Sequence, residues 1–235
     1  MMKFFMSKKK GKTNPWLDIP WRDYEGHMSS PKVRQAQFLR EIFRDALREY
    51  LPQTVAVLGC STGNGFEHID PSITRRVIGV DINPHYLEVL EHRYGAVKPG
   101  LELICADITG IELVSKSFDL IFCGLIFEYV DHGDLIKKIS RWLKPNGMLV
   151  VVLQLARENS TKVSKTEYES LKVLEPIIRL VQPDELESVC SEVGLSETRM
   201  SIETLESEKA FYVGHFKKNH DRESDTHNRK RSRMT

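Results

Sequence analysis

The chain has 235 residues, of which 40% are apolar and 29% are charged, a balance typical of one soluble globular domain. Its formal net charge is +1, so no overall field favours a nucleic acid or a membrane surface as partner. No apolar run reaches the roughly 20 residues of a membrane span, and the opening apolar segment is too short for a signal-peptide core. We therefore expect a cytoplasmic protein. The spacing of its four cysteines predicts no metal site.

Residues 1–52 are predicted to form an N-terminal extension that ends in a cap helix. Its segment 16–28 contains two tryptophans, Tyr24 and His27. Apolar residues then recur at helical spacing over 33–50. This pattern predicts a helix that follows an aromatic segment.

Beyond residue 52, short apolar runs alternate with helical patterns. The predicted strands are 55–58, 77–80, 101–105, 118–123 and 148–153, and the predicted helices are 66–69, 84–94 and 135–143. This alternation implies a parallel sheet with helices on both faces. After a further helix over 183–193, the strands 198–203 and 210–216 are joined by a polar turn, which predicts an antiparallel hairpin.

Residues 154–182 interrupt the alternation, because they are polar at first and then carry a helical pattern. They follow the strand 148–153 and should therefore lie over the carboxyl edge of the sheet, where ligands bind in folds of this kind. We interpret them as a lid or substrate insertion within a domain spanning 53–216, and a plain packing helix is the alternative. The tail 217–235 is charged and nearly free of apolar residues, so it is expected to be disordered.

The most informative segment runs from Val55 to Phe66, where an apolar strand enters a tight turn of small residues. A second apolar strand ends in Asp81, about 20 residues after the turn begins. This layout lets the backbone approach a nucleoside-bearing cofactor and places a carboxylate near its ribose. A dinucleotide fingerprint would need glycine at the positions of Ser61 and Asn64, and no Gly-Lys-Ser/Thr sequence completes a Walker A loop.

The turn instead has the pattern G-x-S/G-x-G directly after the first strand, which resembles the first motif of the class I S-adenosylmethionine-dependent methyltransferases. Other segments resemble that family in the same order along the chain, namely 79–83, 105–108, 118–125, 129–131 and 143–148. The resemblance covers about 54–216. It implies a Rossmann-like, doubly wound α/β fold with a seven-stranded, mostly parallel sheet and an antiparallel C-terminal hairpin strand. It also implies S-adenosyl-L-methionine as cofactor and methyl transfer as activity.

Two positions depart from the family pattern. Val57 stands where the family commonly has an acidic residue, so one negative anchor near the methionine amino group is missing. Ser61 replaces the middle glycine and adds a hydroxyl that could hydrogen-bond the cofactor. These departures leave open how tightly the cofactor is held, and whether another carboxylate replaces the missing one.

The resemblance implies cofactor contacts from the glycine turn, from the ends of three further strands and from the aromatic segment. The candidate residues are Gly59, Cys60, Ser61, Gly63, Asp81, Ile82, Asp107, Ile108, Cys123 and Tyr24. The glycines would bring backbone N–H groups to the methionyl carboxylate, and Asp81 would accept hydrogen bonds from both ribose hydroxyls. Ile82 and Ile108 would sandwich the adenine, whose amino group Asp107 would bind. Helix capping is the alternative role for both aspartates.

Methyl transfer mainly requires that the reactants be aligned and desolvated, although an alcohol or amine acceptor also needs a proton removed. Glu128 and Tyr129 follow the fourth strand, Gln154 ends the fifth, and His27 lies in the aromatic segment. Glu128 and His27 are the candidate bases, and Tyr129 completes the candidate catalytic set. The structural alternatives are a helix cap for Glu128, a surface position for His27 and a packing role for Tyr129.

The expected acceptor is a small molecule, because the net charge is near zero and one compact insertion covers the expected site. Methylation of RNA or protein is the first alternative, with the basic segments 8–10 and 229–233 as contacts. A catalytically silent S-adenosylmethionine-binding protein is the second, and a nucleotide-dependent dehydrogenase is the third. We expect a monomer or homodimer with no metal, nucleic-acid or membrane partner.

Overall fold

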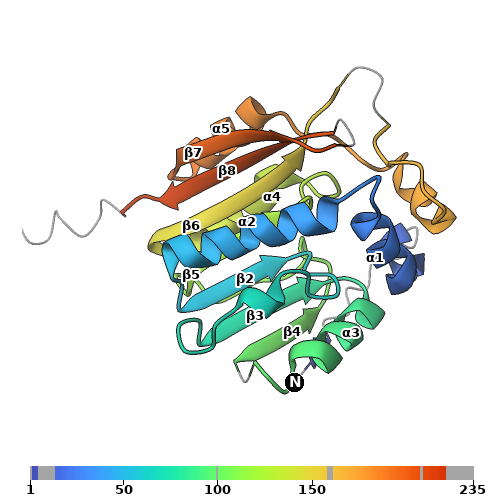
Figure 1. Ribbon diagram of the computed structural model, residues 1–235. Coiled ribbons are helices and arrows are strands. Elements are labelled where there is room, and N and C mark those ends of the chain that lie inside the picture. Colours follow the sequence, from blue (N-terminus) through green and yellow to red (C-terminus); the bar gives the residue numbers. More distant parts are fainter. Residues whose placement is uncertain (1, 5–13, 99, 158–160, 207–208, 221–235) are drawn as a thin grey trace, which may run out of the picture.

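The fold is built on one mixed β-sheet. The computed structural model describes residues 2–4, 14–98, 100–157, 161–206 and 209–220. Eight strands of this part of the chain lie in the order β1-β4-β3-β2-β5-β6-β8-β7 (Figure 1). They are β1 (Met2–Phe4), β2 (Thr54–Leu58), β3 (Arg76–Asp81), β4 (Leu101–Cys105), β5 (Phe118–Gly124), β6 (Leu143–Gln154), β7 (Leu195–Thr204) and β8 (Ala210–Lys218). Neighbouring strands are parallel, except that β8 is antiparallel to both β6 and β7.

The predicted seven-stranded sheet with its antiparallel C-terminal hairpin is confirmed. The eighth strand, β1, pairs with β4 at the sheet edge and was not predicted, because three residues are too short to show a strand pattern. The hairpin is longer than predicted, and β8 includes the first two residues of the stretch assigned to the tail. Residues 5–13 and 221–235, which hold most of the lysine-rich start and the charged tail, lie outside the described residues.

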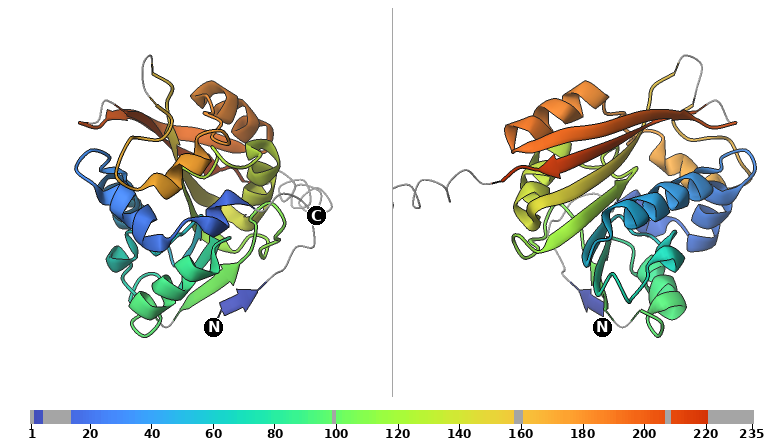
Figure 2. Two further views of the ribbon diagram at one scale, coloured as in Figure 1. Left: turned by 90° about the vertical axis from the view of Figure 1, so that its right-hand side faces the viewer. Right: turned by 60° about the vertical axis from the view of Figure 1, so that its left-hand side comes forward.

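Helices cover both faces of the sheet. The helices of the described residues are η1 (Pro15–Asp18), α1 (Trp21–Ser29), α2 (Gln35–Tyr50), η2 (Phe66–His68), α3 (Pro84–Tyr94), α4 (His132–Trp142), η3 (Glu169–Leu174) and α5 (Pro183–Glu192). Helices α2 and α3 lie on one face of the sheet, and α4 and α5 lie on the other (Figures 1 and 2). Side chains of α2 and α3 belong to one hydrophobic cluster, and those of α4 and α5 belong to another. Within the described residues, no helix combines the length and apolar character needed to cross a membrane.

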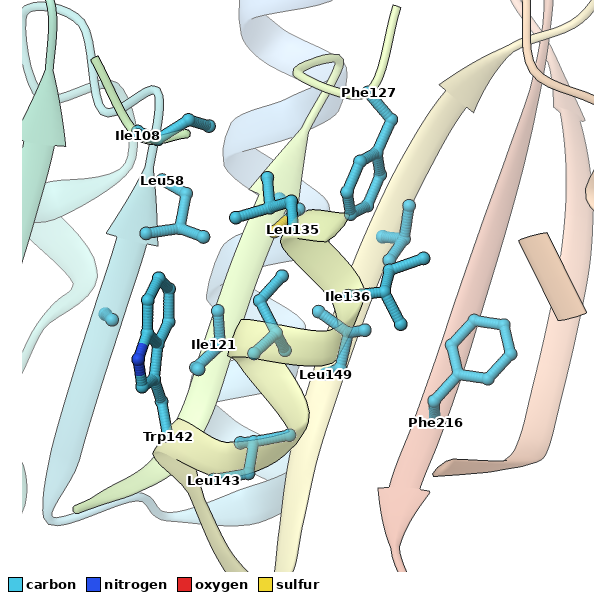
Figure 3. Close-up of a cluster of buried hydrophobic side chains, with 14 of the residues drawn as sticks. Leu58, Ile108, Ile121, Phe127, Leu135, Ile136, Trp142, Leu143, Leu149 and Phe216 are labelled. Carbon is cyan, nitrogen blue, oxygen red and sulfur yellow. The ribbon is translucent and has the colours of Figure 1, made fainter. Parts of the chain in front are cut away.

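The core beneath α4 fixes the two strands that carry the polar part of the site. Leu135 and Ile136 of α4 pack in one cluster with Ile121 of β5 and Leu149 of β6 (Figure 3). Their side chains are essentially inaccessible to solvent. Because β5 and β6 are held by this packing along their length, the residues that follow their carboxyl ends have defined positions.

Replacing Leu149 by alanine should lower the free energy of unfolding by about 2–5 kcal/mol, because it leaves a cavity in a fully buried layer. Urea denaturation of the full chain measures this change as a lower midpoint at constant slope. Val114→Ala is the matched control, since that side chain is 64% exposed. Equal midpoints for the two variants would show that this layer does not hold the sheet.

Candidate active site

A cavity lies where the strand order reverses. Strand β2 has β3 on one side and β5 on the other, and ligands bind outside the carboxyl ends of parallel strands at such a point. The cavity has a volume of about 140 Å³. Its floor is the glycine turn and the ends of the parallel strands, and its roof contains residues of η1, α1 and η3. The left view of Figure 2 looks onto the carboxyl ends of the parallel strands, with α1 and η3 in front.

The glycine turn is hydrogen-bonded to the neighbouring strand from its first residue. The N–H groups of Gly59 and Cys60 both donate to the carbonyl of Val80, at 2.9 and 3.0 Å. Gly59 and Ser61 have φ values of 71° and 50°, in the left-handed region. That conformation costs a residue with a side chain roughly 1–2 kcal/mol, so Ser61 needs a compensating contact. Its N–H supplies one by donating to Asp81 at 2.8 Å.

Asp81 joins this turn to the start of α3. One carboxylate oxygen accepts the N–H of Ser61, and the other accepts the N–H of Asn83 at 2.9 Å. Burial raises the pKa of Asp81 to about 6. The N-cap of α3 is Asn83, whose side chain accepts the N–H of His85, so Asp81 does not have the capping role. Each carboxylate oxygen can accept a second hydrogen bond, which leaves acceptor capacity at the cavity wall.

Three buried polar atoms of the cavity lining have no hydrogen-bond partner among the described residues. They are the hydroxyl of Ser61, the hydroxyl of Tyr86 and one carboxylate oxygen, Oε2, of Glu128. Leaving such a group unpaired costs about 1–3 kcal/mol, so each is a place for a ligand to bond. The hydroxyls of Ser61 and Tyr86, together with the carboxylate of Asp81 and the apolar side chain of Ile108, fit a nucleoside that carries several hydroxyl and amino groups.

Most of the predicted site residues line this cavity, namely Tyr24, His27, Gly59, Ser61, Asp81, Ile82, Asp107, Ile108, Glu128 and Tyr129, together with Gln154. Three others do not. The side chains of Cys60 and Cys123 are buried in the two hydrophobic clusters that cover the sheet faces. Gly63 has Leu90 and Tyr94 as its neighbours. The carboxylate of Asp107 also accepts the N–H and hydroxyl of Thr109, at 2.9 and 2.7 Å.

Helix α1 joins the predicted insertion to the glycine turn. The Glu25 carboxylate accepts the hydroxyl of Thr62 in the turn and is paired with Arg93 of α3. On the other side of the helix, the hydroxyl of Ser170 donates to Asp23 at 2.7 Å. The helix therefore contacts both the glycine turn and the segment that was predicted as an insertion. We call η1, α1 and residues 161–182 the cover of the cavity.

Aromatic rings form the underside of the cover. The ring of Trp16 lies 5.0 Å from that of Tyr129, and the ring of Tyr24 lies 5.3 Å from that of Tyr86. Burial raises the pKa of Tyr24 to about 12 and that of Tyr129 further. Both phenols are therefore neutral near pH 7, so they can donate hydrogen bonds but are poor bases.

The two candidate bases differ in their protonation. Burial raises the pKa of Glu128 to about 7, while its Oε1 accepts the N–H of Gln154 at 2.7 Å. Burial, and then the charge of Lys209, lower the pKa of His27 to about 4. Its Nδ1 lies 2.9 Å from the hydroxyl of Thr166. Near pH 7 His27 is thus a neutral, weakly basic ring, whereas Glu128 is close to its titration point.

Sequence reasoning missed several polar residues of the lining. Gln35, Tyr86 and Lys209 are buried side chains at the cavity wall. Lys209 immediately precedes β8, and no motif or periodicity distinguishes it from the many exposed lysines of the chain. We call Gln35, Glu128, Gln154 and Lys209 the polar end of the cavity, because hydrogen bonds connect them through Gln154.

Comparisons with known proteins agree with this geometry. The family model described as a methyltransferase domain matches residues 56–151. An uncharacterized methyltransferase-like protein of Schizosaccharomyces pombe is 33% identical over 95 residues, which are 40% of this chain and 36% of that protein. Phosphoethanolamine N-methyltransferase 3 of Arabidopsis thaliana is 30% identical over 101 residues, 42% of this chain and 20% of that enzyme. The matched part of the chain thus spans less than half the length of these relatives.

Solved structures share the fold over most of the chain. The N-methyltransferase NodS of Bradyrhizobium japonicum, in complex with S-adenosyl-L-homocysteine, superposes with a TM-score of 0.62 at 16% identity. The match covers 85% of this chain and 98% of that one. Residues 56–151, which contain the glycine turn and Asp81, are thus similar to a methyltransferase domain, and the chain shares its fold with a solved methyltransferase.

Proposed function

We propose that this protein transfers the methyl group of S-adenosylmethionine to a small-molecule acceptor. The observation that carries the proposal is a single covered cavity that has a different carboxylate at each of its two ends. The carboxylate of Asp81 lies in its wall beside the glycine turn, and the unpartnered Oε2 of Glu128 lies in its wall beyond β5. These two groups assign one end of the cavity to the cofactor and the other end to the acceptor.

The cover supports a small acceptor over a macromolecular one. Ile19, Leu171, Leu174 and Ile178 form a separate hydrophobic cluster, in contact with the ring of Trp16, across the carboxyl edge. An apolar roof at this edge suits a compact molecule better than a charged polymer strand. The names of the relatives include both a small-molecule and a protein-bound acceptor. Phosphoethanolamine N-methyltransferases represent the first class, and a malonyl-[acyl-carrier protein] O-methyltransferase of Marinomonas represents the second.

In this proposal, residues 53–216 are the methyltransferase domain and 154–182 are its substrate-facing insertion. The bound cofactor supplies an electrophilic methyl group on a sulfonium. Asp81 holds the ribose hydroxyls, and the apolar side chains of Ile82 and Ile108 contact the adenine. Glu128 accepts the proton of an acceptor hydroxyl or amine at Oε2, while its Oε1 stays bonded to the N–H of Gln154.

Calorimetry with S-adenosylhomocysteine and with NADH tests the cofactor half of the proposal, and we expect saturable binding of the former alone. Methyl-labelled S-adenosylmethionine, incubated with the protein and a size-fractionated cell extract, tests the acceptor half. Label should appear in the small-molecule fraction. Label confined to RNA or protein would contradict the small-molecule acceptor, and binding without any transfer would identify a silent cofactor-binding protein.

Replacing Asp81 by asparagine should weaken S-adenosylhomocysteine binding by about 1.5–3 kcal/mol, the scale of hydrogen bonds to a charged group. Asparagine keeps one oxygen and can accept the N–H of Ser61 or that of Asn83 but not both, so thermal unfolding of the variant must first show that it is folded. Calorimetry measures the dissociation constant. Asp134→Asn on the exposed side of α4 is the control. An unchanged constant in the Asp81 variant would place the ribose elsewhere.

Glu128→Gln should slow methyl transfer about 10²–10⁴-fold while S-adenosylhomocysteine still binds, because glutamine keeps the oxygen bonded to Gln154 but cannot take a proton. The raised pKa of Glu128 gives the sign of the pH effect. Since the ionised form is the base, the wild-type rate should rise as pH increases through about 7. Single-turnover rates measure both effects, with Glu88→Gln at an exposed site as control. Full activity of the Glu128 variant would remove it from the reaction.

A further inference from the structure

Lys209 places a positive charge inside the polar end of the cavity. Its side chain lines the cavity wall and the residue is only 6% exposed. Lysine is rarely this buried unless its charge is paired, because burial removes the hydration of the ammonium group. The surroundings of this ammonium therefore decide what the cavity can bind.

Both protein partners of the Lys209 ammonium are neutral. It donates to the side-chain oxygen of Gln154 at 3.1 Å and to the carbonyl of Lys162 at 2.8 Å. No carboxylate among the described residues lies within ion-pair distance of it. Burial lowers the pKa of Lys209 to about 8, and no acidic group of the described residues opposes this shift. An ammonium group has three N–H donors, so one is left for a further acceptor.

Glu128 does not neutralise this charge, although both groups contact Gln154. Its Oε1 accepts the backbone N–H of Gln154, whereas Lys209 bonds the side-chain amide of the same residue. His27, which feels the charge of Lys209, is itself neutral near pH 7. The ammonium of Lys162 donates instead to the carbonyl of Ile178 at 2.7 Å. The positive charge of Lys209 at the polar end is thus not paired with a negative charge of any described residue.

We propose that the methyl acceptor carries a carboxylate that binds the ammonium of Lys209, while its methyl-accepting atom faces Oε2 of Glu128. This inference rests on the proposed function, since it names the substrate class of the same cavity. A bound carboxylate takes the remaining N–H of Lys209 and restores the pairing that a buried ammonium requires.

The single positive charge of Lys209 favours an acceptor with one negative charge over an acceptor with two. One ammonium at this position can neutralise one carboxylate. A phosphate dianion would bring a second negative charge next to Glu128, and the ammonium of Lys209 can neutralise only one of the two. Such an excess charge is costly at low dielectric.

The test uses the full chain saturated with S-adenosylhomocysteine and matched probes that differ in charge. The carboxylates are acetate, octanoate and phenylacetate, the neutral partner is phenylacetamide, and the dianion is phenyl phosphate. By calorimetry, phenylacetate should bind about tenfold or more tightly than phenylacetamide, and phenyl phosphate should not surpass it. Equal binding of acid and amide, tightest binding of the phosphate, or no saturable binding by any carboxylate would overturn the proposal.

Lys209→Met should abolish the preference for the acid and leave the dissociation constant of S-adenosylhomocysteine unchanged. Lys137→Met, at an exposed site on α4, is the matched control and should keep the preference. A preserved preference in the Lys209 variant would overturn the assignment. If that variant does not fold, the comparison of acid and amide in the wild-type protein still decides. Failure of S-adenosylhomocysteine to bind would instead count against the proposed function, and the carboxylate series can then be titrated without it.

Discussion

The carboxylate of Asp81 is the contact on which the rest of the site depends. It lies at the end of β3 and accepts one N–H from the glycine turn after β2 and another from the start of α3. The strained conformation of Ser61 and the entry into α3 are thus held by one buried group. Because that group is a carboxylate at the point where the strand order reverses, the same contact that shapes the turn presents acceptor oxygens to a ligand.

The cover changes the chemistry of the side chains beneath it. The exclusion of water from the cavity disfavours charged groups. It therefore raises the pKa of Glu128 and lowers the pKa values of Lys209 and His27. Burial brings Glu128 to the range where a carboxylate can accept a proton near pH 7. For Lys209 it leaves a cation that protein oxygens solvate only in part. One physical cause therefore underlies both the proposed base and the proposed anion site.

The polar end depends on a junction of three chain segments. Gln154 ends β6, Lys209 precedes β8, and the carbonyl of Lys162 belongs to the insertion. The antiparallel pairing of β6 with β8 brings the first two together, since Gln154 lies opposite Phe211. The C-terminal hairpin, which closes the sheet on this side, thereby also supplies a side chain to the cavity.

The order of the amino acids alone was enough to predict the alternation of strands and helices, the glycine turn and the position of Asp81. These features depend on residues close together in the chain: the period of apolar residues, the small residues of a turn, and an acid at a strand end. The faces on which side chains lie, and the contacts between residues far apart in the chain, could be seen only in the folded protein. Cys123 belongs to the α4 side of β5 because alternate residues of a strand point to opposite faces. Lys209, Gln35 and Tyr86 reach the cavity from separate elements, and no local pattern carries that information because their meeting is a property of strand order and packing.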